Sequence, residues 1–247
     1  MMKRMYMNLL YGTMAMLLAS AAACDDGRIE ENLRESSTEE GRVVKLTGQL
    51  SGVSTWNSAY SLAVAGYNET SNYAVISKAI PTNQPDGTTI EWIMTGIADE
   101  VKTIKLCAID KLRRSVADFV VLTQDDWASA TDDTIRMDLG TLNVSMFSAI
   151  QKEVFNAKCV SCHGQSTFAG AGLYLTEGKS YEALVNKSSE RNPSFLLVQP
   201  EDPDNSFLYH VITENGIVNH DHMDLFSEKD ESQLELIKKW IEHGAQQ

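Results

Sequence analysis

The chain has 247 residues, of which 43% are hydrophobic, and its formal net charge is −13. This length leaves room for one large domain or two small ones, and the apolar content is sufficient for a sizeable core. The acidic balance argues against a nucleic-acid partner, because phosphate backbones are bound by clustered lysine and arginine side chains.

Residues 1–23 have the layout of a secretory signal peptide. Two basic residues precede the apolar stretch 9–19, and small residues follow it up to Ala23. Cys24 comes next, and small residues ending in a cysteine resemble the lipobox of bacterial lipoproteins. The resemblance implies cleavage after Ala23 and lipidation of Cys24, which would anchor the protein at a membrane of the cell envelope, facing the periplasm or the cell surface. Ordinary cleavage, with Cys24 left as a free thiol, is the alternative.

The chain then changes character twice. Residues 24–42 are acidic and polar and lack apolar periodicity, which predicts a flexible tether. Residues 43–142 contain short stretches of alternating apolar and polar residues, separated by turn-rich segments such as 82–88. Period-two alternation predicts antiparallel strands, and about seven strands in a hundred residues predict an immunoglobulin-like β-sandwich.

From Asn143 onward the apolar residues take a helical spacing. A first helix is predicted to run into a cysteine pair, and shorter helices are predicted at 180–189 and 206–213. The last helix is predicted after Ser227, a favourable N-cap residue. We therefore expect a second, helical domain over residues 143–247.

The motif Cys159-Val-Ser-Cys162-His163 carries the most specific chemistry in the chain. Two cysteines three apart on a helical turn face the same way, so both thiols can form thioethers with the vinyl groups of one haem. His163 can then bind the iron as the proximal ligand. Export agrees with this interpretation, because haem c is attached outside the cytoplasm. One covalent haem c is the expected cofactor.

Other chemistries of the cysteine pair stay open. Two thiolates with His220 and His222 could form a tetrahedral zinc site, although only one residue separates these histidines. Dithiol redox chemistry is typical of a strand–helix junction in a βαβ unit, and no such pattern precedes Cys159. A structural disulfide is the simplest alternative, and an exported chain with four cysteines could hold two. Otherwise Cys107 is predicted to be a buried free thiol.

A haem iron bound by His163 needs a second axial ligand from the protein. Met223, 60 residues further along, would complete a His/Met pair with a raised reduction potential. His222 is the alternative distal ligand, and it would give a bis-histidine haem of lower potential. With both axial positions held by side chains, no open position remains for oxygen chemistry.

Residues 147–245 resemble the class I c-type cytochromes, most closely the planctomycete-type cytochrome c domain. In that family a helix leads into CxxCH, a proline- and acid-containing segment precedes a methionine, and the terminal helix ends in W-I-x-x-G-A. The matching segments are "FSAIQKEVFNAKCVSCHG", "VQPEDPDNSFLY" and "LELIKKWIEHGA". Glu201 stands where the family commonly has glycine. The resemblance implies an all-α cytochrome c domain.

Position by position, the resemblance implies that Cys159 and Cys162 are the thioether attachments and His163 the proximal ligand. It implies Met223 as the distal ligand. Asp224 follows this methionine, whereas the family usually has proline there.

The sequence therefore predicts two domains, an N-terminal immunoglobulin-like β-sandwich followed by an all-α cytochrome c domain. The function that we expect is that of a membrane-anchored monohaem c-type cytochrome. It would carry single electrons between redox partner proteins and perform no catalysis itself. The alternatives are a haem subunit of an oxidoreductase complex and a zinc-stabilised binding or adhesion lipoprotein.

Overall fold

The computed structural model describes residues 41–164 and 168–247. They belong to one compact unit that spans Glu40–Gln247. The predicted signal peptide, Cys24 and nearly all of the predicted tether lie outside the described residues. No helix within 41–164 and 168–247 is both long and apolar enough to span a bilayer.

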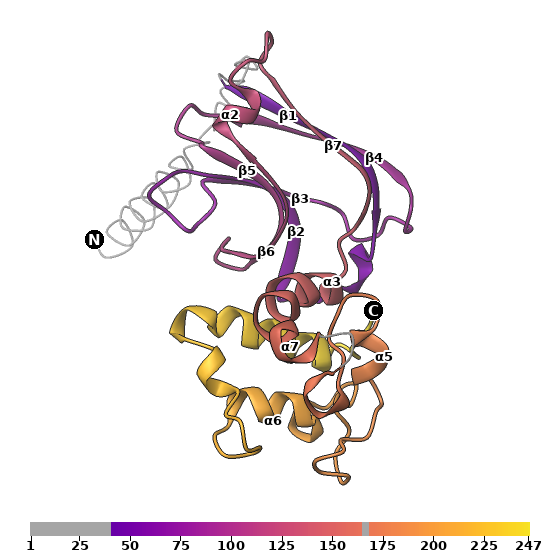
Figure 1. The fold of residues 1–247 in the computed structure, drawn as a ribbon. Coiled ribbons are helices and arrows are strands. Elements are labelled where there is room, and N and C mark those ends of the chain that lie inside the picture. The colour runs from indigo at the N-terminus through magenta and orange to yellow at the C-terminus, as the bar shows by residue number, and fades with distance from the viewer. Residues whose placement is uncertain (1–40, 165–167) are drawn as a thin grey trace, which may run out of the picture. The chain divides into compact units, whose positions relative to one another are not determined.

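The first part of the described chain forms two β-sheets (Figure 1). One has the strand order β4-β1-β7 and the other the order β3-β2-β5-β6. β1 and β7 run parallel, and the other pairs are antiparallel. The short helix α2 (Gln124–Trp127) joins β6 to β7. The strands are β1 (Arg42–Ser51), β2 (Tyr60–Tyr67), β3 (Ile76–Ala79), β4 (Thr89–Ile97), β5 (Thr103–Asp110), β6 (Ser115–Thr123) and β7 (Thr134–Asn143).

Side-chain alternation explains how these strands bury one face. In β1, Val44 and Leu46 are buried, whereas Lys45 between them is only partly so. β2 is different, because Leu62–Tyr67 is buried without a break, so both faces of this strand are covered. The core between the two sheets includes Leu46, Leu62, Val64, Met94, Ile104, Leu106, Ile135 and Met137.

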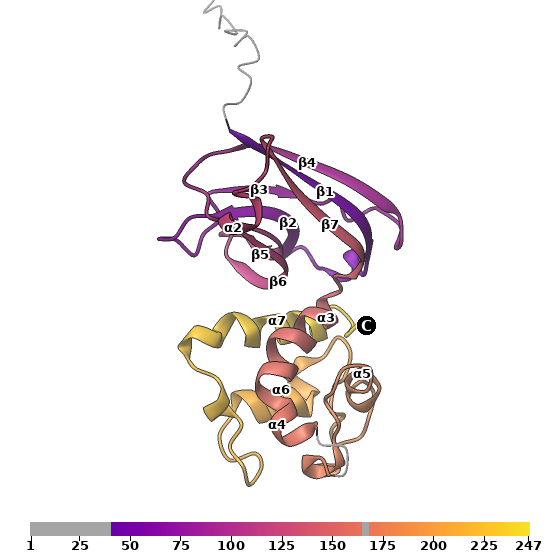
Figure 2. The ribbon, with the colours of Figure 1, turned by 45° about the horizontal axis from the view of Figure 1, so that its top comes forward.

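Short helices and turns make up the rest of the chain. α3, a π-helical segment and α4 follow one another and lead away from the sheets (Figure 2). α7 is the longest, with 12 residues, and it follows a capping box formed by Ser227 and Asp230. The helices of this part are α3 (Met146–Ile150), the π-helical segment Gln151–Cys159, α4 (Val160–His163), α5 (Ser180–Leu184), α6 (Phe207–Thr213) and α7 (Glu231–Glu242). Single 3₁₀ turns are η2 (Val53–Thr55), η4 (Gly170–Gly172), η5 (Pro203–Asn205), η6 (Met223–Leu225) and η7 (Glu228–Asp230).

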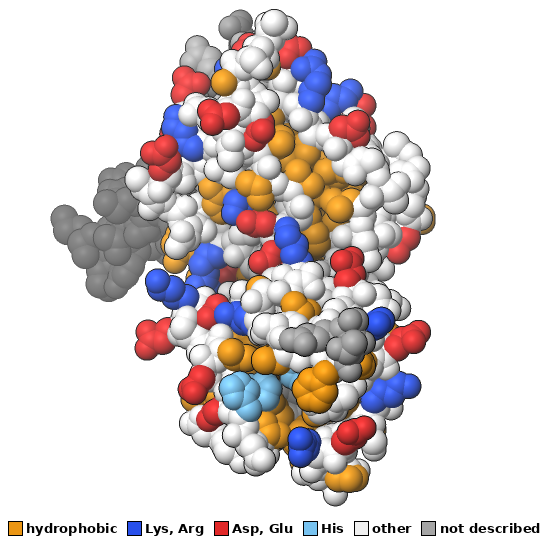
Figure 3. All heavy atoms as spheres, viewed as in Figure 1, with side chains coloured by type: hydrophobic (Ala, Val, Ile, Leu, Met, Phe, Trp, Pro, Cys, Tyr) orange, Lys and Arg blue, Asp and Glu red, His pale blue; other side chains and the backbone are white. Residues whose placement is uncertain are grey.

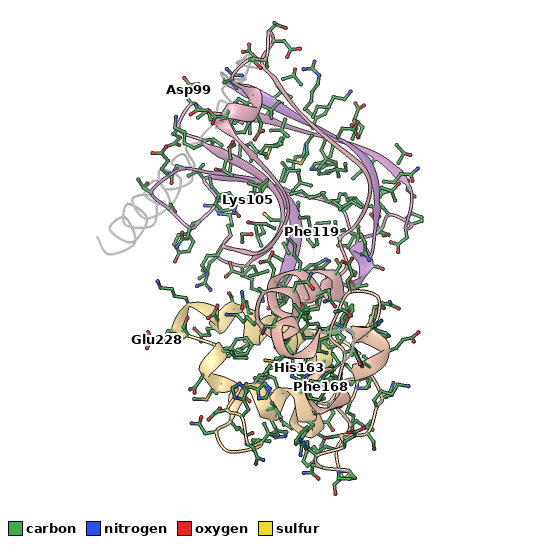
Figure 4. The ribbon with its side chains drawn as sticks, viewed as in Figure 1. Asp99, Lys105, Phe119, His163, Phe168 and Glu228 are labelled. Carbon is green, nitrogen blue, oxygen red and sulfur yellow. The ribbon has the colours of Figure 1, made fainter. Side chains whose placement is uncertain are left out.

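Sheets and helices share one hydrophobic cluster. The Trp56 indole N–H donates to the Val144 carbonyl at 2.6 Å, and the Asn57 side-chain amide donates to the Lys239 carbonyl at 3.3 Å. Phe119 of β6, labelled in Figure 4, packs against this cluster as well as against the core between the sheets. The cluster contains Trp56, Ala108, Val116 and Ala117 from the sheet side, and Phe147, Ile150, Phe155, Leu184, Ile237 and Trp240 from the helical side.

These observations correct the predicted fold class. The expectation of an all-α cytochrome c domain over residues 143–247, and the resemblance of 147–245 to class I c-type cytochromes, are wrong. The described chain is a β-rich fold with two sheets and short helices, and its helical segment completes its core against sheet side chains. Helical periodicity shows which side of a helix is apolar, but it does not show whether a helix or a sheet covers that side.

Candidate functional site

The two cysteines of the motif lie where the π-helical segment passes into α4. The Val160 N–H donates to the Phe155 carbonyl five residues back, which is the wide turn of a π-helix. Cys159 is half-buried against the shared cluster, and Cys162, three residues on, is exposed. Both are free thiols. Burial raises the pKa of the Cys159 thiol to about 11, partly opposed by the positive charge of Lys158.

His163 ends α4 and is held by the loop that follows. Its Nδ1 lies 3.2 Å from the Leu173 carbonyl oxygen, and its own carbonyl accepts the Leu175 N–H at 2.8 Å. A Cβ at Gly170 would lie 3.2 Å from His163 Cε1, so a glycine there lets the backbone approach the ring. A carbonyl oxygen can only accept, so Nδ1 is the donor in this bond, and Nε2 is the ring nitrogen that the bond leaves available.

A second histidine faces this one from a distant part of the chain. The ring centres of His163 and His222 are 6.1 Å apart, with 34° between the ring planes. His222 Nδ1 lies 2.8 Å from the His220 carbonyl oxygen, and the His220 and His222 rings meet edge to face at 5.2 Å. His222 is therefore held through Nδ1 by a backbone carbonyl, in the same way as His163. Burial lowers the pKa of His222.

Met223 directly follows this histidine. Its backbone N–H donates to Asp221 Oδ1 at 3.1 Å, and it begins the turn η6. Its side chain is half-buried. The structure thus brings the segment of both predicted distal ligands close to His163.

The surface around these histidines is apolar. Figure 3 shows histidine side chains gathered on the helical segment, with hydrophobic side chains beside them. Phe168, which Figure 4 labels close to His163, is 71% exposed, a large value for an aromatic side chain. Leu225 of η6 is also exposed. An apolar rim next to imidazole nitrogens suits a flat, largely apolar ligand that carries a metal.

A bare metal ion requires a denser ligand set than this. Within the described ranges, no three or more His, Cys, Asp or Glu side chains are grouped so as to hold a metal ion. The zinc alternative needs Cys159, Cys162, His220 and His222 to converge on one point, and the structure does not gather them into such a group.

A cleft of about 560 Å³ lies away from the CxxCH motif. It is lined mainly by polar and charged residues, including Lys105 and Asp118, whose ion pair measures 2.7 Å. Gln233 of α7 also lines it. The residues of the CxxCH motif do not contribute to this cleft.

Cys107 is a buried free thiol, with its sulfur 3.6 Å from the Tyr67 hydroxyl.

Sequence reasoning missed the groups that orient the histidines. The acceptors are the backbone carbonyls of Leu173 and His220, and backbone acceptors leave no pattern in a sequence. The closely spaced Gly170 and Gly172 were the one available signal, because glycines mark close backbone approach.

Comparison with known proteins gives no family for this chain. No family model matches it, and neither the curated proteins nor the solved structures contain a significant match. The fold and the site therefore carry the functional argument.

Proposed function

We propose that this chain binds one haem covalently through Cys159 and Cys162 and carries single electrons between redox partner proteins. The observation that carries the proposal is the hydrogen bond through which the Leu173 carbonyl holds His163, next to two free thiols in the chain. Its Nδ1 is bound to the Leu173 carbonyl, so its Nε2 can serve as a metal ligand.

The donor set fits a haem of the c type. Each thiol adds its sulfur to one carbon of a vinyl group and its hydrogen to the other. The addition needs no oxidant and releases no leaving group. It does need reduced cysteines, and Cys159 and Cys162 are both free thiols. When bound, the haem supplies a one-electron centre, in which ferric iron takes up an electron and ferrous iron returns it.

The remaining roles belong to the protein. The loop through Leu173 orients His163, and the exposed Phe168 offers an apolar surface to a ligand. Two side chains would suffice to hold a haem iron, whereas a bare zinc ion would need more ligands from the protein. Lipidation of Cys24, which would hold the protein at an envelope membrane, belongs to the same proposal and is supported by the sequence alone.

Expression in a host that matures c-type haem proteins tests covalent attachment. We expect haem to stay with the polypeptide on a denaturing gel, and the intact mass to rise by one haem. Cys159→Ala together with Cys162→Ala should abolish both signals. Cys107→Ala is the matched control, because it removes a buried free thiol outside the motif and should keep the haem. A colourless wild-type chain of unmodified mass, made in cells that load their own cytochromes, would refute the proposal.

The membrane anchor needs a separate test. Cys24→Ala should move the protein from the membrane fraction to the soluble fraction without changing its haem content. If the variant stays with the membranes, lipidation of Cys24 is not the anchor.

A further inference from the structure

We infer that His222, and not Met223, is the second axial ligand of the bound haem. The inference rests on the proposed function, because it names the residue opposite His163 at the same site. It departs from the sequence-based expectation, which favoured the methionine.

The first argument is the separation of the two rings. With metal–imidazole bonds of about 2.0 Å, and about 1.1 Å from each ligating nitrogen to its ring centre, two imidazoles on opposite sides of one metal have centres roughly 6 Å apart. The ring centres of His163 and His222 are 6.1 Å apart. The measured separation therefore matches the one that two imidazoles sharing a metal require, although packed rings such as Phe147 and Phe155 have the same spacing.

The second argument is the ring nitrogen that each histidine uses for its hydrogen bond. His222 Nδ1 lies 2.8 Å from the His220 carbonyl oxygen, and His163 Nδ1 lies 3.2 Å from the Leu173 carbonyl oxygen. Each bond uses Nδ1 as the donor and leaves Nε2 available, the arrangement that typically orients a metal-bound histidine. The two histidines, 59 positions apart in the chain, are thus prepared in the same way.

The third argument is the backbone around Met223. Its N–H is bound to Asp221 Oδ1, and its carbonyl accepts the Phe226 N–H at 3.0 Å. The His222 carbonyl accepts the Leu225 N–H at 3.1 Å. These bonds fix the turn in the conformation that already brings the His222 ring to His163. Ligation by the Met223 sulfur would displace that ring, because neighbouring residues would compete for one position.

The ligand determines the redox range of the partners. An imidazole stabilises ferric iron more than a thioether does, so a bis-histidine haem has a lower reduction potential than a His/Met haem. We therefore expect this chain to exchange electrons with partners of lower potential than those of a His/Met cytochrome.

Spectroscopy of the purified full-length holoprotein tests the assignment. The wild type should be low-spin and should lack the long-wavelength sulfur-to-iron absorption band. His222→Ala should lose the low-spin spectrum, and added imidazole should restore it. Met223→Leu should leave both the spectrum and the reduction potential unchanged. His220→Ala is the matched control, since it removes a neighbouring imidazole from the same loop, and it should stay low-spin.

The outcomes separate the inference from the proposed function. A sulfur-to-iron band that Met223→Leu abolishes, or a low-spin spectrum that survives His222→Ala, overturns His222 as the ligand and leaves covalent haem intact. A wild type that is already high-spin overturns it as well. A wild type without haem on a denaturing gel overturns both. Gel staining of every variant shows whether a changed spectrum reflects lost ligation or lost haem.

Discussion

Replacing Trp56 with phenylalanine tests whether the sheets and the helical segment unfold as one unit. Trp56 is 6% exposed, and its indole N–H donates to the Val144 carbonyl at the start of the helical segment. Phenylalanine keeps an aromatic ring beside Tyr60, whose ring centre is 5.7 Å away, but removes this donor. A buried carbonyl that loses its donor costs about 1–3 kcal/mol, so the opening equilibrium constant should rise about 5- to 150-fold.

Hydrogen exchange followed by mass spectrometry resolves this effect by segment. Peptides from β5 and from α7 report the two sides of the shared cluster, because Ala108 and Trp240 both belong to it. If the described residues open as one cooperative unit, the slowest amides in both peptides share one opening free energy. Trp56→Phe should then lower that free energy by the same amount in both.

An exposed position on β6, the strand that pairs with β5, supplies the control. Val121 of β6 is 45% exposed, so Val121→Ala should change the opening free energy by no more than about 0.5 kcal/mol. Faster exchange in β5 with unchanged exchange in α7 would show that the two regions open independently. That result would refute the argument from the shared cluster.

Three further predictions concern ionisable groups. In the haem-free protein at about pH 8, Cys162 should be alkylated faster than Cys159. Raising the Cys159 pKa from 9.0 to about 11 leaves about 100-fold less of its thiolate, which is the form that reacts. Equal alkylation rates, measured by peptide mass spectrometry, would contradict this prediction. Asp230→Ala should lower the free energy of unfolding by about 0.5–1.5 kcal/mol at neutral pH, because the Asp230 carboxylate accepts hydrogen bonds from the Ser227 N–H and hydroxyl. Backbone and side-chain hydrogen bonds from Ser227 lower the Asp230 pKa, so this stabilisation is lost as the pH falls through the folded-state pKa, and a deficit that persists in strong acid would argue against the cap. A hydrogen bond to the Asp204 backbone carbonyl in η5, and to a smaller extent the Glu214 carboxylate, raises the pKa of His210. The stabilisation that protonated His210 contributes is therefore complete in acid and is lost as the pH rises through the folded-state pKa. Measured by denaturation between about pH 5 and pH 8, the free energy of unfolding of His210→Gln should depend less on pH than that of the wild type.

Local structure could be predicted from the sequence because local signals produce it. Alternating residues such as Val44 and Leu46 do lie in a strand, and the helix expected at 206–213 is found as α6 (Phe207–Thr213). Ser227 does form a capping box, although the box closes a 3₁₀ turn before α7 begins. Each signal depends on residues within one turn or one strand of each other.

Long-range relations could not be predicted in the same way. The parallel pairing of β1 with β7 joins segments about ninety residues apart, and no residue pattern specifies it. The Trp56 bond to Val144 spans 88 positions. The approach of His222 to His163 depends on irregular loops, whose course follows from the packing of the whole unit. The fold class was wrong at this level, because the partner of each apolar face was unknown.

The π-helical segment before Cys159 has a consequence for changes in chain length. A π-helical turn accommodates more residues than an α-helical turn, so it corresponds to a residue inserted into an α-helix. Deleting one residue between Gln151 and Cys159 could tighten the turn to ordinary α-helix and leave the cysteines and His163 on their present side. Proteins usually absorb such length differences in surface loops. In this chain a helix can absorb one, so we expect related sequences to align with a gap directly before the CxxCH motif.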